Sequence, residues 1–561
     1  MKTFSKVHFK SIRAFIRKVT ISGFITSLIM ATGIFSTTYY VSTAGNDSTG
    51  TGSLSLPWKT IQKAANSIAP GDIVNIASGT YREQVTINSL SGGSAAGGYK
   101  TFTSYNGTVY IKGSDVVKSW VLHSGSIWKK TGWTVNSQQV FQQYVPLQQI
   151  GWPDPAFTEY EGTLKKYNEI GEGVGDMFAG SFFYDDAGDT LYVWCRNNAD
   201  PNTQIMEASV RTRVIAYYGQ YVKFTGLNML HNNSLDTAQM LGGVEIGSYN
   251  EVSNCIIRYM DFTGIKFALQ PVGARIIDCD ILDNGCQGFG GTGVGTGTLV
   301  RNCVIRGNNY RNFTTTWNAG GSKMAGANDI IIEHSEFTGN NGCAVWFDVG
   351  TAMGDKKTVI RNNYIHNNIN GSGAIHIEIQ EKAEIYNNII AYNSKRGVYI
   401  SGSDYCKVYN NTIAYTSERE SIGIGGLPRT GYTCSYNEVY NNIIYNSLDI
   451  DLFIAKRSDA VGNECNNNLF FSTARSSVVL KILNDDGIVN TYSDLTDWKT
   501  ATGFDTVSKR ESPQFLSQTA DQYPLQSTSP CIGAGIFLPE VTVDYALSLR
   551  NNPPDIGAYE Y

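Results

Sequence analysis

The stretch "YNNII" at residues 386–390 indicates the fold, because it returns as "YNNTI" at 409–413 and as "YNNII" at 440–444. Such motifs recur every 23 to 31 residues, and apolar and polar residues alternate on both sides of each. A period of this length with this alternation predicts coils of three short strands, each stacked on the next. The earlier members are "SNCII" (253–257), "IDCDI" (277–281), "RNCVI" (301–305), "IEHSEF" (332–337) and "RNNYI" (361–365).

One column of the repeat is expected to lie at a corner inside the coils. Asparagine side chains there can hydrogen-bond up and down the stack, which satisfies polar groups that are costly to bury. The sequence therefore predicts an all-β protein built as a right-handed parallel β-helix. The expected column is Cys255, Cys279, Cys303, His334, Asn363, Asn388, Asn411 and Asn442.

Composition agrees with many short strands joined by turns. The 561 residues include 58 glycines and 57 tyrosines and phenylalanines, and only 17% are charged. A net charge of -5 provides no basic face for nucleic acid. Three of the ten cysteines recur at steps of 24 without CxxC partners, which favours stacked apolar thiols over disulfides or zinc ligands.

The N-terminus has the pattern of a signal peptide over residues 1–36. Six lysines and arginines precede an apolar run at 19–35, and small residues follow. A membrane anchor is the alternative, but the run is short for a bilayer span, and no other stretch could cross one. We expect a secreted, extracellular protein, possibly associated with the cell surface.

The remaining chain is expected to divide into a solenoid, its caps and an insert. A short helix at 60–68 would cover the open apolar end of the solenoid. Five tryptophans (Trp120, Trp128, Trp133, Trp152 and Trp194) and a hairpin-like stretch at 181–194 interrupt the repeat. The expected parts are an N-terminal cap with the first coils (37–114), an inserted β subdomain (115–210), the β-helix with a catalytic groove (211–510) and a C-terminal cap (511–561).

Two strands end in a carboxylate at equivalent places, "VWFD" at 345–348 and "IHIE" at 375–378. If Val345, Phe347 and Val349 face the core, as do Ile375, Ile377 and Ile379, then Asp348 and Glu378 point outward and stack. Neighbouring strands lie about 4.8 Å apart. A retaining glycosidase holds its two carboxyl groups about 5 to 5.5 Å apart, so the spacing favours retention.

Lys323 is expected one coil earlier in the same vertical column. It would keep Asp348 ionised, while repulsion from Asp348 would favour the protonated form of Glu378. Such a pair suits a nucleophile and an acid/base. A solvated salt-bridge ladder without catalytic function is the alternative.

Other residues beside the pair are expected to bind substrate. Aromatic rings pack against the C–H groups of sugars, so Trp317 and Trp346 are the predicted platforms. His376 would be a hydrogen-bonding residue of the groove, and a loop at 351–357 would lie alongside. The predicted substrate-binding set is Trp317, Asn318, Trp346, His376, Tyr399 and Arg429, with no metal site and no cofactor.

The opening segment, the asparagine column and the ending "DIGAYEY" (555–561) resemble secreted bacterial β-helix proteins that act on polysaccharides. Among these are the family 9 pectate lyases and the family 120 β-xylosidases. The xylosidases are similar at the Trp-x-Asp strand end, which implies Asp348 as nucleophile and Glu378 as acid/base. Related proteins often have an acidic residue where this chain has Asn318, and that departure weakens an inherited substrate assignment.

Two other functions compete with a glycoside hydrolase. In a polysaccharide lyase, Lys323 would take the C5 proton of a uronic acid while acidic residues hold Ca²⁺. No compact acidic cluster lies near Lys323 in sequence, and Arg396, Arg419 and Arg429 are the cations available for an acidic polymer. A non-catalytic glycan-binding solenoid would use the same groove but would tolerate the loss of either carboxylate.

Overall fold

The computed structural model describes residues 36–151, 170–234, 241–268, 270–350, 355–426, 429–517 and 522–561. Apart from Ser36, the predicted signal peptide lies outside these residues, as do Trp152 and positions 351–354 of the loop expected beside the carboxylates. No helix among the described residues has both the length and the apolar character needed to cross a membrane.

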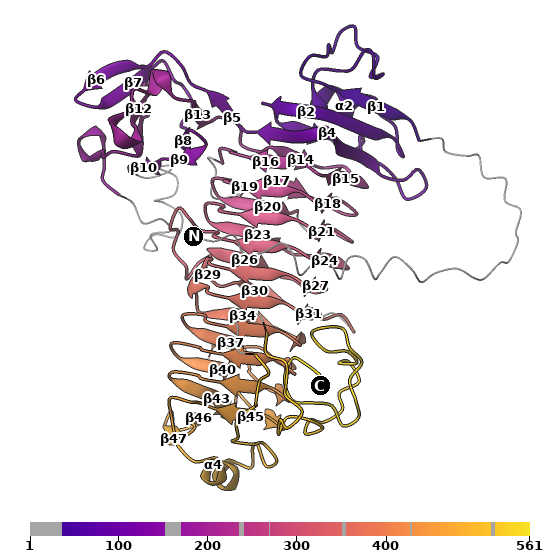
Figure 1. Cartoon of the computed structure of the whole chain (residues 1–561), viewed down its shortest axis with the longest axis vertical. Coiled ribbons are helices and arrows are strands. Elements are labelled where there is room, and N and C mark those ends of the chain that lie inside the picture. Colours follow the sequence, from indigo (N-terminus) through magenta and orange to yellow (C-terminus); the bar gives the residue numbers. More distant parts are fainter. Residues whose placement is uncertain are drawn as a thin grey trace, which may run out of the picture. The chain divides into compact units, whose positions relative to one another are not determined.

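Two long sheets form the body of residues 37–561, and the predicted parallel β-helix is confirmed. In the described chain the smaller sheet has 13 strands, which lie one above another in Figure 1. All its pairings are parallel except that of β46 with β47. These strands are β3 (Val85–Ile87), β14 (Ile215–Tyr217), β17 (Gly242–Ile246), β20 (Thr263–Phe267), β23 (Gln287–Thr292), β26 (Gly320–Ala325), β30 (Val345–Gly350), β34 (Gly373–Gln380), β37 (Arg396–Ser401), β40 (Glu420–Ile424), β43 (Ile450–Lys456), β46 (Leu480–Asn484) and β47 (Val489–Tyr492).

The larger sheet has 23 strands in the described chain, and it contributes two short strands to most coils. β29 (Asn341–Gly342) and β33 (Ile369–Asn370) form a separate two-stranded sheet, and β29 contacts β26 of the smaller sheet. The strands of the larger sheet are β1 (Thr38–Val41), β2 (Ile73–Tyr81), β4 (Lys100–Lys112), β15 (Val222–Thr225), β16 (Asn228–Leu230), β18 (Glu251–Ser253), β19 (Ile256–Arg258), β21 (Arg275–Ile277), β22 (Asp280–Leu282), β24 (Thr298–Arg301), β25 (Val304–Arg306), β27 (Ile330–Glu333), β28 (Glu336–Thr338), β31 (Thr358–Arg361), β32 (Tyr364–His366), β35 (Ala383–Tyr386), β36 (Ile389–Ala391), β38 (Lys407–Tyr409), β39 (Thr412–Ala414), β41 (Glu438–Tyr440), β42 (Ile443–Tyr445), β44 (Glu464–Asn466) and β45 (Leu469–Phe471).

The two asparagines of each "YNN" motif have different tasks. The first, such as Asn387 with φ 54°, takes the left-handed conformation that turns the corner, which asparagine tolerates better than most residues. The second is buried and bonds to the next coil: the Asn388 side-chain amide donates to Asn411 Oδ1 at 3.0 Å and to the Ile360 carbonyl at 2.9 Å. The predicted ladder therefore exists, and it continues to Asn468.

The prediction for His334 was wrong by one position. His334 occupies the left-handed corner position, with φ 51°. Ser335 is the buried ladder residue: its Oγ accepts a hydrogen bond from the Cys303 backbone N–H, and its own backbone N–H donates to Asn363 Oδ1. A second ladder, which the sequence reading missed, runs at another corner through Asn284, Asn308, Asn340, Asn368 and Asn393 with side-chain bonds of 2.8 to 3.0 Å.

Helices cover both ends of the continuous core. The predicted N-terminal helix is confirmed as α2 (Ile61–Ser67), capped by Thr60, and its Ile61 and Ala64 are fully buried. The other end is covered by α4 (Leu495–Thr502), whose Trp498 is fully buried in the same core. Each helix shields apolar edges that a stack of coils would otherwise leave in water.

The insert forms two small sheets with a core of its own around Trp120, Phe182 and Leu191. Lys112 of β4 joins it to the first coils through a 2.9 Å ion pair with the buried Glu207. Its strands are β5 (Ser114–Val116), β6 (Val121–Ser124), β7 (Ile127–Thr131), β8 (Val140–Gln142), β9 (Val145–Pro146), β10 (Gln148–Gln149), β11 (Ser181–Asp185), β12 (Thr190–Trp194) and β13 (Met206–Ser209), with short 3₁₀ turns at Val174–Asp176, Arg196–Asn198 and Pro201–Thr203.

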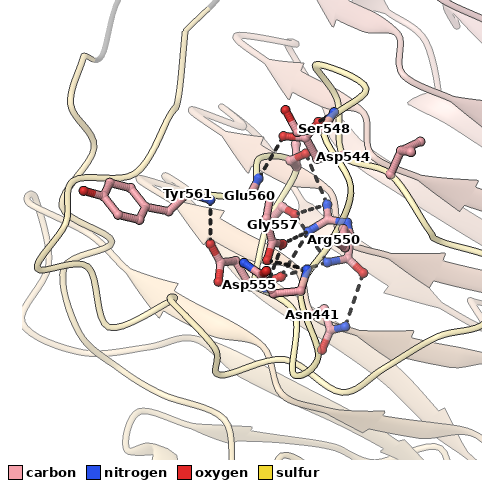
Figure 2. Close-up of polar contacts among 12 residues, drawn as sticks. Asn441, Asp544, Ser548, Arg550, Asp555, Gly557, Glu560 and Tyr561 are labelled. Carbon is pink, nitrogen blue, oxygen red and sulfur yellow. Dashed lines mark hydrogen bonds and ion pairs between the residues drawn. The ribbon is translucent and has the colours of Figure 1, made fainter.

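The C-terminal segment lies along the side of the coils, which differs from its expected place as an end cap. The corner asparagines hold it: Asn362 donates to the Asp544 carbonyl at 2.8 Å and Asn410 to the Asp555 carbonyl at 3.0 Å. Figure 2 shows how the tail is locked, with the buried Arg550 donating to Glu560 at 3.1 Å and to the Gly557 carbonyl at 2.9 Å. The motif "DIGAYEY" therefore stabilises a lateral cover.

We predict that Asn388→Ala lowers the free energy of unfolding by about 3 kcal/mol, because it leaves buried partners unsatisfied on two coils. Urea-induced unfolding followed by circular dichroism measures the effect. Asn66→Ala, at an exposed position of α2, is the control and should change the value by less than about 0.5 kcal/mol. Equal stabilities for the two variants would contradict a stabilising role for the ladder.

Candidate active site

Strand register brings Asp348 and Glu378 side by side. They are paired residues on β30 and β34, and Val345, Phe347, Ile375 and Ile377 face the core as expected. Val349 and Ile379 do not face the core: both have left-handed backbones, with φ of 50° and 51°, and Val349 is 51% exposed. Because the chain bends directly after each carboxylate, the alternation of inward and outward residues ends there.

Lys323 contacts Asp348 from a different column than predicted. On β26 it pairs in register with Trp346, while Ala325 pairs with Asp348, so the expected vertical Lys-Asp-Glu column was wrong. The expected position of Lys323 was therefore two residues out of register with Asp348. The lysine side chain instead crosses diagonally and places Nζ 2.9 Å from Asp348 Oδ2.

Trp346 makes the same diagonal contact one coil further on. Its indole Nε1 donates to Glu378 Oε2 at 2.9 Å. The other oxygen of Glu378 forms an ion pair with Arg429. Glu378 therefore has two donors that the sequence did not predict, in addition to its neighbour Asp348. The side chains of Asp348 and Glu378 are 20% and 12% exposed, so both reach solvent.

An aromatic column orients this pair. Trp346, His376 and Tyr399 are in register on β30, β34 and β37, with ring centroids 5.2 and 5.0 Å apart. The Lys323 ammonium lies 3.7 Å from the Trp346 ring centre. Lys323 and His376 come from opposite neighbouring strands, so both faces of Trp346 are covered and the ring is only 4% exposed. Trp346 thus has no free face for a sugar, contrary to its expected use as a platform.

His376 is enclosed in the column and lacks hydrogen bonds. It is 3% exposed, and neither ring nitrogen has a partner. Burial, with the nearby Arg429, Arg396 and Lys323 charges, lowers the pKa of His376 to about 3. Because the pKa falls below the ordinary value of the imidazole, the ring is neutral at ordinary pH. A neutral enclosed imidazole serves as a spacer between Trp346 and Tyr399.

Trp317 and Asn318 lie at the edge of this arrangement. The Trp317 carbonyl accepts a 2.8 Å hydrogen bond from Lys323 Nζ, and its ring packs near Phe262 at 6.1 Å between centroids. Asn318 is buried.

Three ion pairs balance the charge of the site. Besides Lys323 with Asp348 and Arg429 with Glu378, Arg396 pairs with Glu420 and lies 4.3 Å from the Tyr399 ring centre. The sequence analysis did not predict the contribution of Glu420, because this residue lies on β40, two coils beyond Glu378. Only its position within the repeat could have indicated that it lies near the site. Each of these cations has its own carboxylate, which leaves no excess positive charge among them.

A Ca²⁺ site does not fit the described residues. They include no group of three or more Asp, Glu, His or Cys side chains placed to hold a metal ion. Asp348, the carboxylate beside Lys323, is already paired with its ammonium.

Comparison with known proteins agrees with the fold. A family model described as right handed beta helix region matches residues 193–353 and 348–494, more than half of the 561 residues. A family of proteins of unknown function matches residues 43–87. No curated protein matches the chain.

Several solved structures are similar to this chain over most of its length. The complex of XylC with xylose has a TM-score of 0.60 and 16% identity, covering 93% of this chain and 98% of that one. A glycoside hydrolase has a TM-score of 0.49 and 12% identity over 80% and 95% of the two chains. Pectate lyase Pel9A has a TM-score of 0.44 and 14% identity over 94% and 97%. At 16% identity, the similarity to the XylC complex shows a shared fold alone.

We predict that His376 does not titrate between pH 5 and 8, since its pKa lies near 3 and its charged form would be buried beside three cations. Carbon-13 NMR of labelled histidine rings measures this, and the signal is assigned by its loss in His376→Phe. A midpoint above pH 5 would contradict the enclosed geometry. Thermal unfolding of His376→Phe should remain cooperative, because the substitution retains an aromatic ring in the column.

Proposed function

We propose that this chain, which belongs to the right-handed β-helix family, is a secreted enzyme that hydrolyses glycosidic bonds with retention of configuration. The observation that carries the proposal is the in-register pairing of Asp348 and Glu378 on neighbouring strands. Strands in a sheet lie about 4.8 Å apart. That value is close to the carboxyl separation of retaining glycosidases, about 5 to 5.5 Å, and well below that of inverting enzymes.

The environment of each carboxylate supports a distinct role. Asp348, paired with the Lys323 ammonium, would attack the anomeric carbon and form a covalent glycosyl-enzyme intermediate. Glu378 would first protonate the leaving oxygen and then remove a proton from the attacking water. Lys323 would orient Asp348, and the aromatic column would keep Lys323 and Trp346 aimed at the two carboxylates.

The contacts of Lys323 favour hydrolysis over polysaccharide lyase chemistry. A lyase base needs a free lone pair directed at the C5 proton of a uronic acid. The Lys323 ammonium instead bonds to Asp348 and to the Trp317 carbonyl and lies against the Trp346 ring. The balanced ion pairs likewise favour a neutral glycan. XylC is seen with xylose, so xylo-oligosaccharides are the first substrates to test.

Substrate contacts follow from this assignment. Trp317 and Asn318 remain the proposed contacts at the edge of the site, whereas Trp346, His376 and Tyr399 would act through the column they form. The partner is an oligosaccharide or polysaccharide outside the cell, and no cofactor is required by the proposed chemistry.

We predict that Asp348→Ala and Glu378→Gln each lower kcat at least about 1000-fold, because the first removes the nucleophile and the second the proton donor of the proposed reaction. Circular dichroism and thermal unfolding should remain near those of the unsubstituted protein. Reducing-end release from xylo-oligosaccharides and a wider glycan panel measures turnover, and proton NMR of the first product identifies its anomer. Substantial activity in both variants would rule out the assignment.

The same panel separates the competing functions. New reducing ends without ultraviolet absorbance from unsaturated uronyl groups support hydrolysis. Absorbance that disappears with a Ca²⁺ chelator would instead indicate a lyase with Lys323 as base. Glycan binding by isothermal calorimetry without any turnover, equal in the unsubstituted protein and Asp348→Ala, would indicate a non-catalytic solenoid.

A further inference from the structure

A cavity of about 650 Å³ lies at the end of the solenoid that carries β43, β46 and α4 (Figure 1). Two turns border it, one at 456–463 after β43 and the other at 484–486 between β46 and β47. Its volume is within the range of about 300 to 1,000 Å³ that is typical of small-molecule sites. The residues that line it include Lys456, Arg457, Ser458, Asp485, Asp486 and Phe504.

The walls of this cavity are joined to one another. Lys456, at the end of β43, pairs in register with Asn484, at the end of β46. Just beyond that pair, Asp485 Oδ1 accepts a hydrogen bond from the Ser458 backbone N–H at 2.6 Å. The two bordering turns are thus fastened to each other by the protein's own contacts. A ligand would enter a preformed space and would not have to order the chain around it, which lowers the free-energy cost of binding.

The charges around the cavity are balanced. Two cations, Lys456 and Arg457, and two carboxylates, Asp485 and Asp486, line it. Arg457 is buried, and its guanidinium donates to the Asp459 carboxylate at 2.7 and 3.1 Å. A strongly anionic ligand would meet the two lining carboxylates, and a cationic ligand would meet Lys456, which disfavours both. The lining therefore suits a neutral ligand that both donates and accepts hydrogen bonds.

Phe504 supplies an apolar wall. Its ring packs against the fully buried Trp498, with ring centroids 5.9 Å apart, and the Lys456 ammonium lies 5.7 Å from its centre. The core of the C-terminal end thus holds the ring at the edge of the cavity. Aromatic rings pack against the C–H groups of sugars, whose hydroxyls at the same time bond to polar side chains. An apolar wall combined with balanced polar groups is therefore suited to a sugar.

We propose that this cavity is a second glycan-binding site, which holds a chain of neutral sugars without cleaving it. The carboxylates of Asp485 and Asp486 would accept hydrogen bonds from sugar hydroxyls. Lys456 would donate to a sugar oxygen, and the Phe504 ring would pack against C–H groups. Each carboxylate also accepts a backbone N–H, at 2.6 Å for Asp485 and at 2.9 Å for Asp486, and is therefore a fixed acceptor. This inference goes beyond the proposed function, because binding at the cavity requires no catalysis.

The cavity and the carboxylate pair lie along the same edge of the smaller sheet. Asp348 and Glu378 are near the carboxyl ends of β30 and β34, and Lys456 is the last residue of β43. In that sheet β43 is the third strand after β34. Three strand spacings of about 4.8 Å correspond to about 14 Å along the solenoid. A polymer held at the cavity therefore stays close to the proposed catalytic pair.

The first experiment locates bound glycan by amide hydrogen exchange and mass spectrometry. The protein carries Glu378→Gln so that the glycans stay intact, and the probes are xylohexaose, cellohexaose and mannohexaose. At least one of these neutral chains should slow exchange in both bordering turns, at 456–463 and 484–488. Hexagalacturonate, an acidic chain of the same length, should protect the turns less. The proposal is overturned if none of the neutral chains protects them, or if the acidic chain protects them equally.

The second experiment fills the cavity. Ser458 is exposed and lines it, so the indole of Ser458→Trp would occupy the space that the sugar needs. The glycan concentration that gives half-maximal protection of the turns should rise at least about tenfold. Ser124→Trp, at an exposed position of β6 in the insert, adds the same ring elsewhere and should leave that concentration unchanged. Equal effects of the two variants would contradict a site in the cavity.

A milder pair of variants tests the polar contacts without filling the space. Asp486→Asn keeps the shape of the side chain but removes its charge, so the concentration for half-maximal protection should rise at least about threefold. Asp186→Asn is the control, because Asp186 is likewise an exposed aspartate in a hairpin turn, between β11 and β12. A response of Asp486→Asn no larger than that of Asp186→Asn would remove Asp486 from the site.

These readouts separate the second site from the proposed function, since none of them requires turnover. If the glycan panel shows no hydrolysis but neutral chains protect the turns, the proposed function fails and the second site stands. Hydrolysis by the unsubstituted protein, without protection of the turns by any neutral chain, would retain the proposed function and refute the second site. Protection of β30 and β34 reports binding at the carboxylate pair separately, because these strands do not line the cavity.

Discussion

The hydrogen-bonded register between neighbouring coils is the constraint on which the rest of this structure depends. Parallel strands at a constant spacing place equivalent residues of successive coils in columns. The asparagine ladders maintain the columns at the corners, where strand pairing ends and the chain has to turn. A side chain buried at such a corner must bond both to the backbone of one coil and to the ladder residue of the next, and asparagine has the donor and acceptor groups to do so.

In the candidate site, two side chains contact a carboxylate that lies diagonally across from them on the next strand. Lys323 bonds to Asp348, and Trp346 bonds to Glu378; in both cases the carboxylate lies on the following strand. These contacts run diagonally because Trp346 and Asp348, like His376 and Glu378, are two positions apart and lie on the same face of their strand. Stacked rings hold the donors, and a left-handed residue after each carboxylate bends the chain away. The stacked rings and the bend in the chain together fix the two carboxylates on one face of the solenoid.

The charge pattern of the site also depends on distant parts of the chain. Arg429 and Glu420 lie 51 and 42 positions after Glu378 in sequence, yet the coils bring both into the same neighbourhood. Their side chains convert a face with two carboxylates into a set of matched ion pairs. This balance is the reason that neutral sugars are the proposed substrates, and it depends on a segment outside the strands that carry Asp348 and Glu378.

The sequence by itself determined the repeat, the all-β parallel coil, the cap helix at its beginning and the pairing of Asp348 with Glu378, because these follow from periodicity and from alternation along a strand. Only the tertiary structure decided that Ser335 replaces His334 in the ladder and that Lys323 belongs to the Trp346 column. It also decided that the tail covers the side of the coils and that Arg429 reaches Glu378 over Gly402. Those outcomes depend on turn lengths and on contacts between residues far apart in the chain, which a local pattern does not encode.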